Sequence, residues 1–320
     1  HYPLRRQRQM CIRDRVIQSI DVDTIYDVPI KMLEEGLDRV VLDKLKLTPK
    51  SDLNLDLWKS FLEKYKNPKR KVKIGLVGKY VELQDSYKSI LEAMIHAGAI
   101  NETEVEVVSI HSEFLNQINA QEQLKNLHGL IVAPGFGGRG IEGKIDAITY
   151  VREKKVPFFG ICLGMQMAVI EYARNILMYS NANSTEIDEN TDYPVIDLME
   201  SQKGVDNKGG TMRLGTWNCD LTPGSKVSEV YGEGQITERH RHRFEFNNQY
   251  KKEVFEKGAL KVSGINPETD LVEIVENQDH PWFVGVQFHP EYKSTVSNPH
   301  PLFVAFIKAS IDYLSQQQPI

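Results

Sequence analysis

The chain has 320 residues, of which 41% are hydrophobic and 26% are charged, so it is long enough to form one large domain or two ordinary ones around a real core. Its 39 basic and 44 acidic residues give a net charge of −5, which argues against a general nucleic-acid or anionic-membrane binder. Three cysteines without a CxxC motif argue against a disulfide scaffold and a zinc ribbon, and the longest nearly apolar stretch, 156–170, is too short to span a bilayer, so we expect a soluble cytoplasmic protein.

The first 66 residues differ in character from those that follow. Residues 1–15 contain five arginines and no apolar periodicity, and we expect a non-native or disordered leader there. Apolar residues at helical spacing predict helices within 16–47 and 55–65. Four cations surround Pro68, which we interpret as a solvated linker because no aromatic residues alternate with the charges. The chain is therefore expected to consist of a leader (1–15), a helical segment (16–66) and a larger domain (67–320).

The larger domain begins with strands and helices in alternation. Apolar runs predict strands at 72–78, 105–110, 129–133 and 156–161, with helical patterns at 85–97, 112–126 and 141–154 between them. This alternation predicts a parallel sheet covered by helices on both faces. Beyond residue 212 the pattern is strand-like and without helices, at 214–221, 235–246, 260–265, 271–276 and 282–288, until a C-terminal helix over 302–314. The expected fold class is α/β, with a mostly parallel central sheet flanked by helices and extended by antiparallel strands.

The strongest local signal surrounds Cys162. A buried strand runs directly into the turn Gly160-Ile161-Cys162-Leu163-Gly164, and a helix follows. This pattern is typical of a nucleophile elbow, in which a tight strand-to-helix turn presents the reacting side chain. The N–H groups and partial positive charge of the helix N-terminus favour a thiolate at this place. We identify Cys162 as the candidate nucleophile, against the alternative of a buried structural cysteine. Cys219 is expected to be an ordinary strand residue.

A candidate base follows another apolar strand. Residues 284–288 end in His289-Pro290-Glu291. The spacing of two residues turns both side chains to one side of an extended segment, and the proline disfavours helix at the residue before it. A thiol nucleophile needs a base, and the base needs an orienting partner. The sequence therefore predicts that His289 is the base and that Glu291 orients its ring.

A glycine-rich loop lies between the strand at 129–133 and the next helix. Its residues 135–140 match GxGxxG, so a dinucleotide site has to be considered. The next strand, 156–161, carries no acidic residue for a ribose hydroxyl and ends instead in the candidate nucleophile. We therefore interpret the loop as an oxyanion hole, whose backbone N–H groups would bind a tetrahedral intermediate.

Taken in order, the glycine loop, Gly-x-Cys-x-Gly-x-Gln and His-Pro-Glu resemble the motifs of the class I glutamine amidotransferases, the triad glutaminases. Within these, the segments 78–90, 134–140, 184–186 and 239–245 resemble the CTP synthase family over about residues 16–315. The resemblance implies that Cys162 is the nucleophile, His289 the base and Glu291 its orienting acid. The fold it implies is that of the class I glutamine amidotransferases.

The resemblance also implies a set of substrate-binding residues. Backbone groups at Gly135 and Leu163 would form the oxyanion hole. The ends of an L-glutamine substrate would be held by the side chains of Gln166, Glu186 and Arg243. A carboxylate suits an ammonium group, and a guanidinium suits a carboxylate. No metal site is implied.

Further partners follow from the same resemblance. Family members pass ammonia to a synthetase domain that aminates UTP with ATP and Mg²⁺. The segment around 80–87 resembles the lid that, with GTP as activator, covers the glutaminase site in this family. Residues 16–66 resemble only the last helices of that domain, and the chain has no GxxxxGK[ST] motif. We expect no cofactor, nucleic acid or membrane for this fragment, and a homotetramer for the full-length protein.

Two alternatives remain open. Instead of the domain that the resemblance implies, the chain could be the glutaminase domain of another amidotransferase, such as one for GMP synthesis, or a catalytically idle regulatory fragment that binds nucleotide or partner chains. The lid-like segment beginning Lys79-Tyr80 argues against the first.

Overall fold

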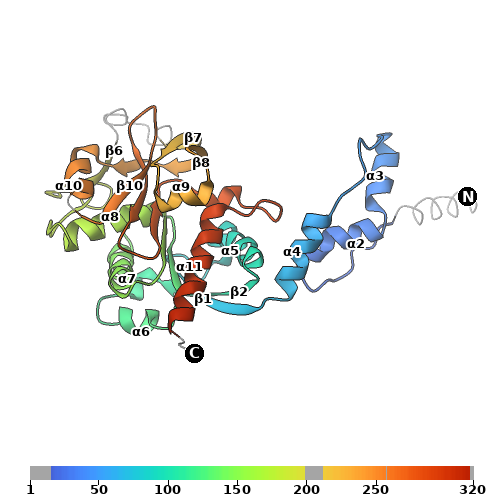
Figure 1. The fold of residues 1–320 in the computed structure, drawn as a ribbon, viewed down its shortest axis with the longest axis horizontal. Helices are drawn as coiled ribbons and strands as arrows, with labels where there is room; N and C mark the ends of the chain where they lie inside the picture. The colour runs from blue at the N-terminus through green and yellow to red at the C-terminus, as the bar shows by residue number, and fades with distance from the viewer. Residues whose placement is uncertain (1–15, 199–211, 257, 318–320) are drawn as a thin grey trace, which may run out of the picture. The chain divides into compact units, whose positions relative to one another are not determined.

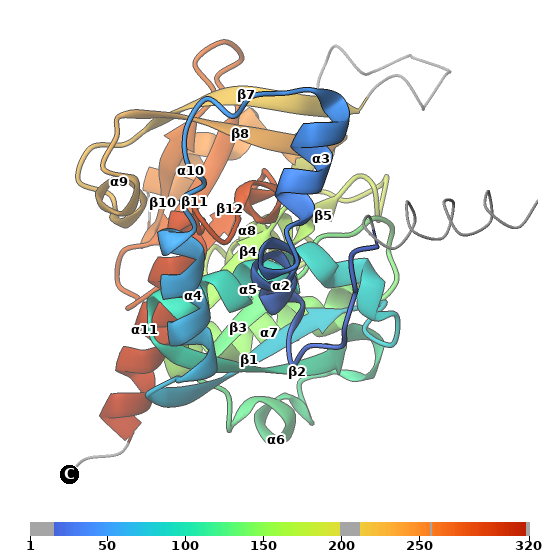
Figure 2. The same cartoon turned by 90° about the vertical axis from the view of Figure 1, so that its right-hand side faces the viewer.

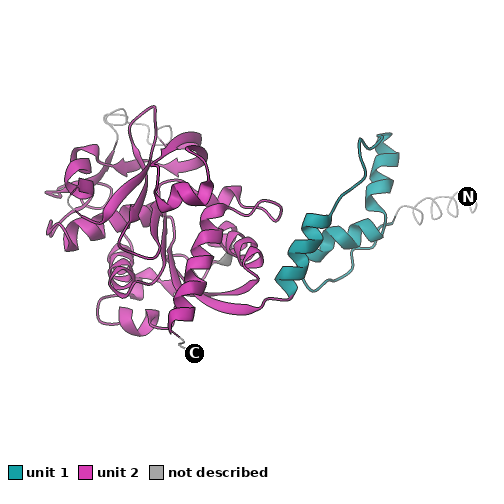
Figure 3. Ribbon diagram, viewed as in Figure 1, with its two compact units in different colours: residues 1–66 teal, residues 67–320 magenta. Residues whose placement is uncertain are grey.

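Two compact units make up the structure. The computed structural model describes residues 16–198, 212–256 and 258–317, and its contacts divide the chain into residues 1–66 and 67–320 (Figure 3). Residues 1–15, for which we expect a leader and which include Cys11, lie outside the described residues. Each unit is considered by itself below.

In the first unit, helices pack around Tyr26. Its elements are η1 (Ile25–Asp27), α2 (Val28–Glu34), α3 (Leu37–Leu45) and α4 (Asp56–Lys66), where η marks a 3-10 helix. The buried ring of Tyr26 meets Phe61 edge-on with 4.9 Å between centroids, and Trp58 Nε1 donates a hydrogen bond of 2.7 Å to the Tyr26 carbonyl oxygen. The helices predicted within 16–47 begin only at Val28. Gly36, in the left-handed region at φ 75°, separates α2 from α3.

The second unit is built on a large mixed sheet, which confirms the predicted fold class. Within the described residues its strands are β1 (Arg70–Gly78), β2 (Thr103–His111), β3 (Gly129–Val132), β4 (Phe158–Ile161), β7 (Arg213–Leu221), β8 (Gln235–His242), β10 (Leu260–Ile265), β11 (Val272–Asn277) and β12 (Phe283–Val286). They lie in the order β2-β1-β3-β4-β12-β11-β10-β7-β8, which Figure 2 shows from β2 and β1 at the bottom to β7 and β8 at the top. The first five are mutually parallel, and the remaining pairs are antiparallel.

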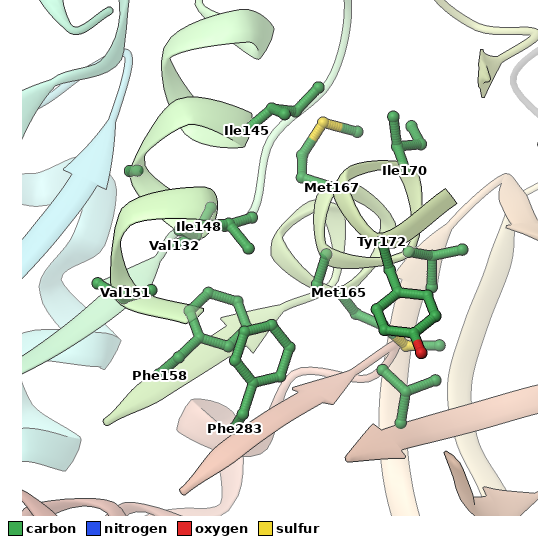
Figure 4. Close-up of a cluster of buried hydrophobic side chains, with 14 of the residues drawn as sticks. Val132, Ile145, Ile148, Val151, Phe158, Met165, Met167, Ile170, Tyr172 and Phe283 are labelled. Atoms are coloured by element: carbon green, nitrogen blue, oxygen red, sulfur yellow. The ribbon is translucent and has the colours of Figure 1, made fainter. Parts of the chain in front are cut away.

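Helices cover both faces of the parallel strands (Figure 1). They are η2 (Gln84–Tyr87), α5 (Lys88–Ile100), η3 (Ser112–Phe114), α6 (Ala120–Leu124), α7 (Ile141–Lys154), α8 (Leu163–Asn175), η7 (Pro290–Lys293) and α11 (Pro301–Gln317). Successive residues of β3 point to opposite faces: Leu130 and Val132 pack with α7 and α8, and Ile131 packs with α5 and α11. Figure 4 shows the first of these clusters, in which Phe158 meets Phe283 with 4.3 Å between ring centroids. The continuous apolar runs in the sequence follow from this two-sided burial.

The segment beyond residue 212 differs from the prediction in three ways. Among the described residues it contains two short helices, α9 (Lys226–Tyr231) and α10 (Lys251–Glu256), and the 3-10 helices η6 (Asn248–Tyr250) and η7. The predicted strand 235–246 is two strands, and the second, β9 (Phe244–Phe246), joins β5 (Asn183–Ser184) and β6 (Pro194–Leu198) in a small second sheet. Finally, β12 is antiparallel to β11 but parallel to β4. The short helices escaped prediction because six residues are too few to establish a helical period.

The predicted helix 112–126 is also interrupted, since only η3 and α6 are helical there. The cause is Asn116, whose side-chain oxygen accepts hydrogen bonds from the N–H groups of Ile118 and Asn119 at 3.0 and 3.1 Å. Such side-chain bonds compete with the helix for backbone donors. In the part of the chain that the structure describes, no helix is long and apolar enough to cross a membrane.

Gly164→Ala is expected to destabilise the second unit. A Cβ at this position would lie 2.3 Å from the carbonyl oxygen of Val132, a backbone atom of the neighbouring strand. Overpacking of this kind costs about 1–3 kcal/mol, and we expect the free energy of unfolding in urea to fall by that amount. The matched control is Gly234→Ala, whose new methyl group would meet nothing within 4 Å and is expected to change stability by less than about 0.5 kcal/mol. Equal stability of the two variants would contradict this packing.

Candidate active site

Cys162 occupies the turn between β4 and α8 and is the N-cap residue of that helix. Its backbone has φ 52° and ψ −103°, in the region that a non-glycine residue rarely adopts. A hydrogen bond of 2.7 Å from the Cys162 N–H to the Val286 carbonyl oxygen ties the turn to β12. The side chain is buried. The predicted tight turn is therefore present, and its backbone strain is held by pairing with the next strand.

His289 reaches the same edge of the sheet because its strand is parallel to the strand that leads to Cys162. In the register of this pair, Val286 lies opposite Ile161. Cys162 therefore follows the carboxyl end of one strand directly, and His289 follows the end of its neighbour by three residues. The N–H of His289 donates to the carbonyl oxygen of Arg239 at 2.8 Å, which anchors it to β8. Sequence reasoning expected this strand to be antiparallel, an arrangement that would not place the two strand ends together.

Glu291 and Tyr292 orient the imidazole of His289. The Nδ1 atom of His289 lies 2.7 Å from Glu291 Oε1, and both side chains are buried. The ring of Tyr292 stacks on the imidazole with 5.2 Å between centroids and 11° between planes. The other ring nitrogen, Nε2, is buried and is not bound by the carboxylate, and a side-chain hydrogen bond with Cys162 acts on the ring. A ring that is fixed by a carboxylate on one nitrogen and interacts with a thiol is suited to proton transfer.

The electrostatic surroundings favour the charged imidazole. Burial lowers the pKa of His289, but the nearby Cys162 and Glu291 more than offset this and raise the pKa to about 11. A raised histidine pKa means that the charged form is present below about pH 11 and is lost only above it. At neutral pH the site thus holds an imidazolium next to a cysteine, an arrangement that stabilises a thiolate.

Gln287 is a neighbour of the sulfur for which the sequence analysis proposed no role. Its Nε2 donates to Cys162 Sγ at 3.7 Å, and its Oε1 accepts a hydrogen bond of 3.2 Å from Gln166 Nε2. The same Gln166 nitrogen donates to the Phe244 carbonyl oxygen at 2.9 Å. Gln166, predicted to bind substrate, therefore holds Gln287 within the protein. The alternation of an extended segment offered a signal, since Gln287 and His289 are two residues apart and share a face.

The glycine loop lies beside the first residue of α8. A Cβ on Gly135 would approach Leu163 Cδ2 to 3.4 Å, so the two predicted oxyanion-hole positions are neighbours. As the first residue of the helix, Leu163 has an N–H without a partner inside the helix. Glu186 supports the loop from the second sheet, because its Oε1 accepts a hydrogen bond of 2.8 Å from the N–H of Gly137. Arg243 is half-buried between β8 and β9.

Lys144 is a second residue near the sulfur that sequence reasoning did not single out. It lies in α7, is 1% exposed and donates a hydrogen bond of 3.0 Å to the Ala133 carbonyl oxygen. Burial and, to a smaller extent, the positive charge of Lys79 lower its pKa to about 7, against the opposing effect of the negative charge of Cys162. Among the described residues, no group of three or more His, Cys, Asp or Glu side chains is placed to hold a metal ion.

Comparisons with known proteins agree with this geometry. The family model described as glutamine amidotransferase class-I matches residues 82–309. The CTP synthase of Flavobacterium psychrophilum is 65% identical over 301 residues, which are 94% of this chain and 56% of the relative; that of Bacteroides fragilis is 55% identical over 297 residues, 93% and 56%. The chain thus spans about half the length of the curated relatives it matches. The Trypanosoma brucei CTPS glutaminase domain, solved with bound acivicin, is 34% identical, with a TM-score of 0.71, and the match covers 75% of this chain and 94% of that one.

Glu291→Gln is expected to lower the pKa of His289 by at least about one unit, or about 1.4 kcal/mol. The amide keeps the size of the side chain but removes the negative charge that helps to hold the imidazolium. The pKa is measured by following the ring resonances of His289 in an NMR titration. Glu229→Gln, at an exposed position, serves as the control and should leave the pKa unchanged. A pKa that is equal in wild type and Glu291→Gln would show that the carboxylate does not act on the ring.

Proposed function

Because the chain belongs to the class I glutamine amidotransferase family, we propose that residues 67–320 hydrolyse the side-chain amide of L-glutamine and release ammonia. One observation carries the proposal. Cys162 lies on a strained strand-to-helix turn, and the neighbouring parallel strand ends at the same edge of the sheet, where it is followed by His289, whose ring is oriented by Glu291. A thiol, an imidazole and a carboxylate in this relation are the components of a nucleophilic triad.

The proposed reaction has two halves that share one nucleophile. In the first, the Cys162 thiolate attacks the amide carbon of glutamine and a tetrahedral oxyanion forms. The carbon–nitrogen bond then breaks, His289 gives its proton to the departing nitrogen, and a glutamyl thioester and ammonia result. In the second, His289 takes a proton from water, whose oxygen attacks the thioester, and glutamate leaves as the sulfur regains its negative charge. The raised pKa of His289 supports its role as the acid of the first half.

The oxyanion hole is proposed at the N–H groups of Gly135 and Leu163, two residues that lie next to each other in the structure. Both halves of the reaction place negative charge on the same oxygen, and fixed backbone donors stabilise that charge without having to reorganise. Glu186 keeps the loop in place through Gly137. Its carboxylate is also the proposed partner of the substrate ammonium group, and Arg243 is proposed to bind the substrate carboxylate. Gln166 is proposed to contribute to substrate binding indirectly, by holding the side chain of Gln287 through a hydrogen bond.

The ammonia is proposed to serve the amination of UTP to CTP. This rests on the curated relatives, which are CTP synthases, and the chain spans only about half of their length. In the whole protein, a synthetase domain would use ATP and Mg²⁺. Residues 16–66 are proposed to be the C-terminal part of that domain, and residues 67–320 are proposed to supply it with ammonia. GTP is the proposed activator and 80–87 the proposed lid. The whole protein is proposed to form a homotetramer. It is proposed to lie in the reducing cytoplasm, where a free thiol such as Cys162 persists.

Cys162→Ala is expected to reduce glutamate release from glutamine by at least about 10³-fold, because the covalent route is lost. The matched control is Cys219→Ala: this second buried cysteine lies in β7, and burial raises the pKa of its thiol, so it should be dispensable. Both variants are assayed for glutamate with and without GTP. Equal rates in wild type and Cys162→Ala would overturn the nucleophile. A wild type without glutaminase activity under either condition would favour an idle regulatory fragment.

Arg243→Lys is expected to raise the KM for glutamine about tenfold or more, with a smaller effect on kcat. Lysine keeps the charge but loses the two-pronged hydrogen bonding of a guanidinium with a carboxylate, which is worth about 1.5–3 kcal/mol. Arg241→Lys on the same segment, where the side chain is exposed, is the control. If both variants change KM alike, the proposed role of Arg243 in binding the carboxylate is wrong.

A further inference from the structure

Lys144 is a buried cation that pairs with no carboxylate among the residues that the structure describes. Its side chain is 1% exposed, and the hydrogen bond to Ala133 leaves two of its three ammonium donors to be satisfied. The effective cost of burying an ion in a protein is several kcal/mol unless an opposite charge offsets it. A buried ammonium group therefore attracts any anion that can form beside it.

The carboxylates of α7 and of the elements packed against it are engaged elsewhere. Four of them bind arginines: Glu113 pairs with Arg139 at 3.2 Å, Glu142 with Arg174 at 2.9 Å, and Glu171 and Glu153 both with Arg152, at 2.9 and 3.6 Å. Of the other two, Asp146 interacts with Gln117, and burial raises its pKa, whereas Glu122 of α6 is exposed to solvent. The charged groups that act on Lys144 are Lys79 and Cys162. Of these two, only Cys162 can supply a negative charge.

The position of Lys144 connects it to both parts of the site. The carbonyl oxygen that it binds belongs to Ala133, which is followed by Pro134 and Gly135 of the glycine loop. A Cβ on Gly135 would lie 3.8 Å from the Lys144 nitrogen and 3.4 Å from a methyl carbon of Leu163. The ammonium group thus lies directly behind the loop, next to the beginning of the helix that carries Cys162.

We propose that Lys144 is a positioning residue of this site, whose ammonium group fixes the glycine loop through Ala133 and stabilises the negative charge of the Cys162 thiolate. The proposal deepens the proposed function, on which it rests for the role of the thiolate. The imidazolium of His289 and the ammonium of Lys144 then act on one sulfur from two different elements. A neutral side chain of the same length would hold the loop less firmly and would leave the thiolate with one cation.

The proposal has a pH dependence with a definite sign. Burial lowers the pKa of Lys144 to about 7, so its charge is present below that pH and is lost as the pH rises through it. The negative charge of Cys162 raises the pKa of Lys144, so the charged lysine and the charged sulfur stabilise each other. The stabilisation of the thiolate by Lys144 is accordingly complete in mildly acidic solution and is lost as the pH rises above neutrality.

The test compares wild type with Lys144→Met, which keeps the length of the side chain and removes the charge. The rate of alkylation of Cys162 by iodoacetamide, a neutral reagent, is measured between pH 5 and pH 9, and the modified peptide is identified by mass spectrometry so that Cys219 does not contribute. The midpoint of the profile is expected to move up by about one pH unit, which makes alkylation about tenfold slower below the midpoint. Lys154→Met, an exposed lysine of the same helix, should leave the profile unchanged.

The remaining outcomes are also decisive. Lys144→Arg, which keeps the charge, should have the wild-type midpoint of alkylation. If Lys144 had only a structural role, Lys144→Met would be less stable than wild type, but its midpoint of alkylation would be unchanged. If Lys144→Met does not fold, the wild-type protein alone decides. Its plot of alkylation rate against pH is expected to show a second inflection near pH 7 from the titration of Lys144, and a plot with a single inflection overturns the proposal. Alkylation needs no glutamine, so a wild type that releases no glutamate would overturn the proposed function and leave this result standing.

Discussion

The site depends on the parallel pairing of β4 with β12. These strands are far apart in the sequence and are joined by a bond between the Cys162 N–H and the Val286 carbonyl oxygen. Parallel strands end at the same edge of a sheet, so residues that follow them are brought together whatever lies between them in the chain. This one register brings the turn at Cys162, Gln287 and His289 to the same edge of the sheet. An antiparallel β12 would present its other end at that edge.

A second theme is the use of burial to control charge. Burial acts against the charged forms of both His289 and Lys144, yet their pKa values move in opposite directions. The difference lies in the partners. His289 has a carboxylate on one ring nitrogen and a cysteine nearby. Lys144 has a neutral carbonyl group and a second lysine in its surroundings, and the same cysteine offsets only part of its shift. The same apolar interior thus holds one cation firmly and leaves the other close to its midpoint at neutral pH.

Much of the site was predictable because its signals are local. The elbow around Cys162 and the His-Pro-Glu segment each lie within a few consecutive residues, and α7 was predicted with its observed bounds. What escaped prediction depends on tertiary contacts. A lysine in a helix is ordinarily exposed, and only the packing of α7 against the sheet reveals that Lys144 is buried. The direction of β12 likewise is not encoded in its apolar alternation, which is the same for either direction.

The backbone conformation of Cys162 affects which residues this position can hold without loss of stability. Its φ of 52° with ψ of −103° suits glycine, and holding a residue with a Cβ there costs about 1–3 kcal/mol. Selection for thermal stability alone would therefore favour glycine at this position and discard the sulfur. The proposed chemistry and the local backbone preference therefore oppose each other at a single residue, and the pairing of the turn with β12 supplies stability that makes a side chain tolerable there.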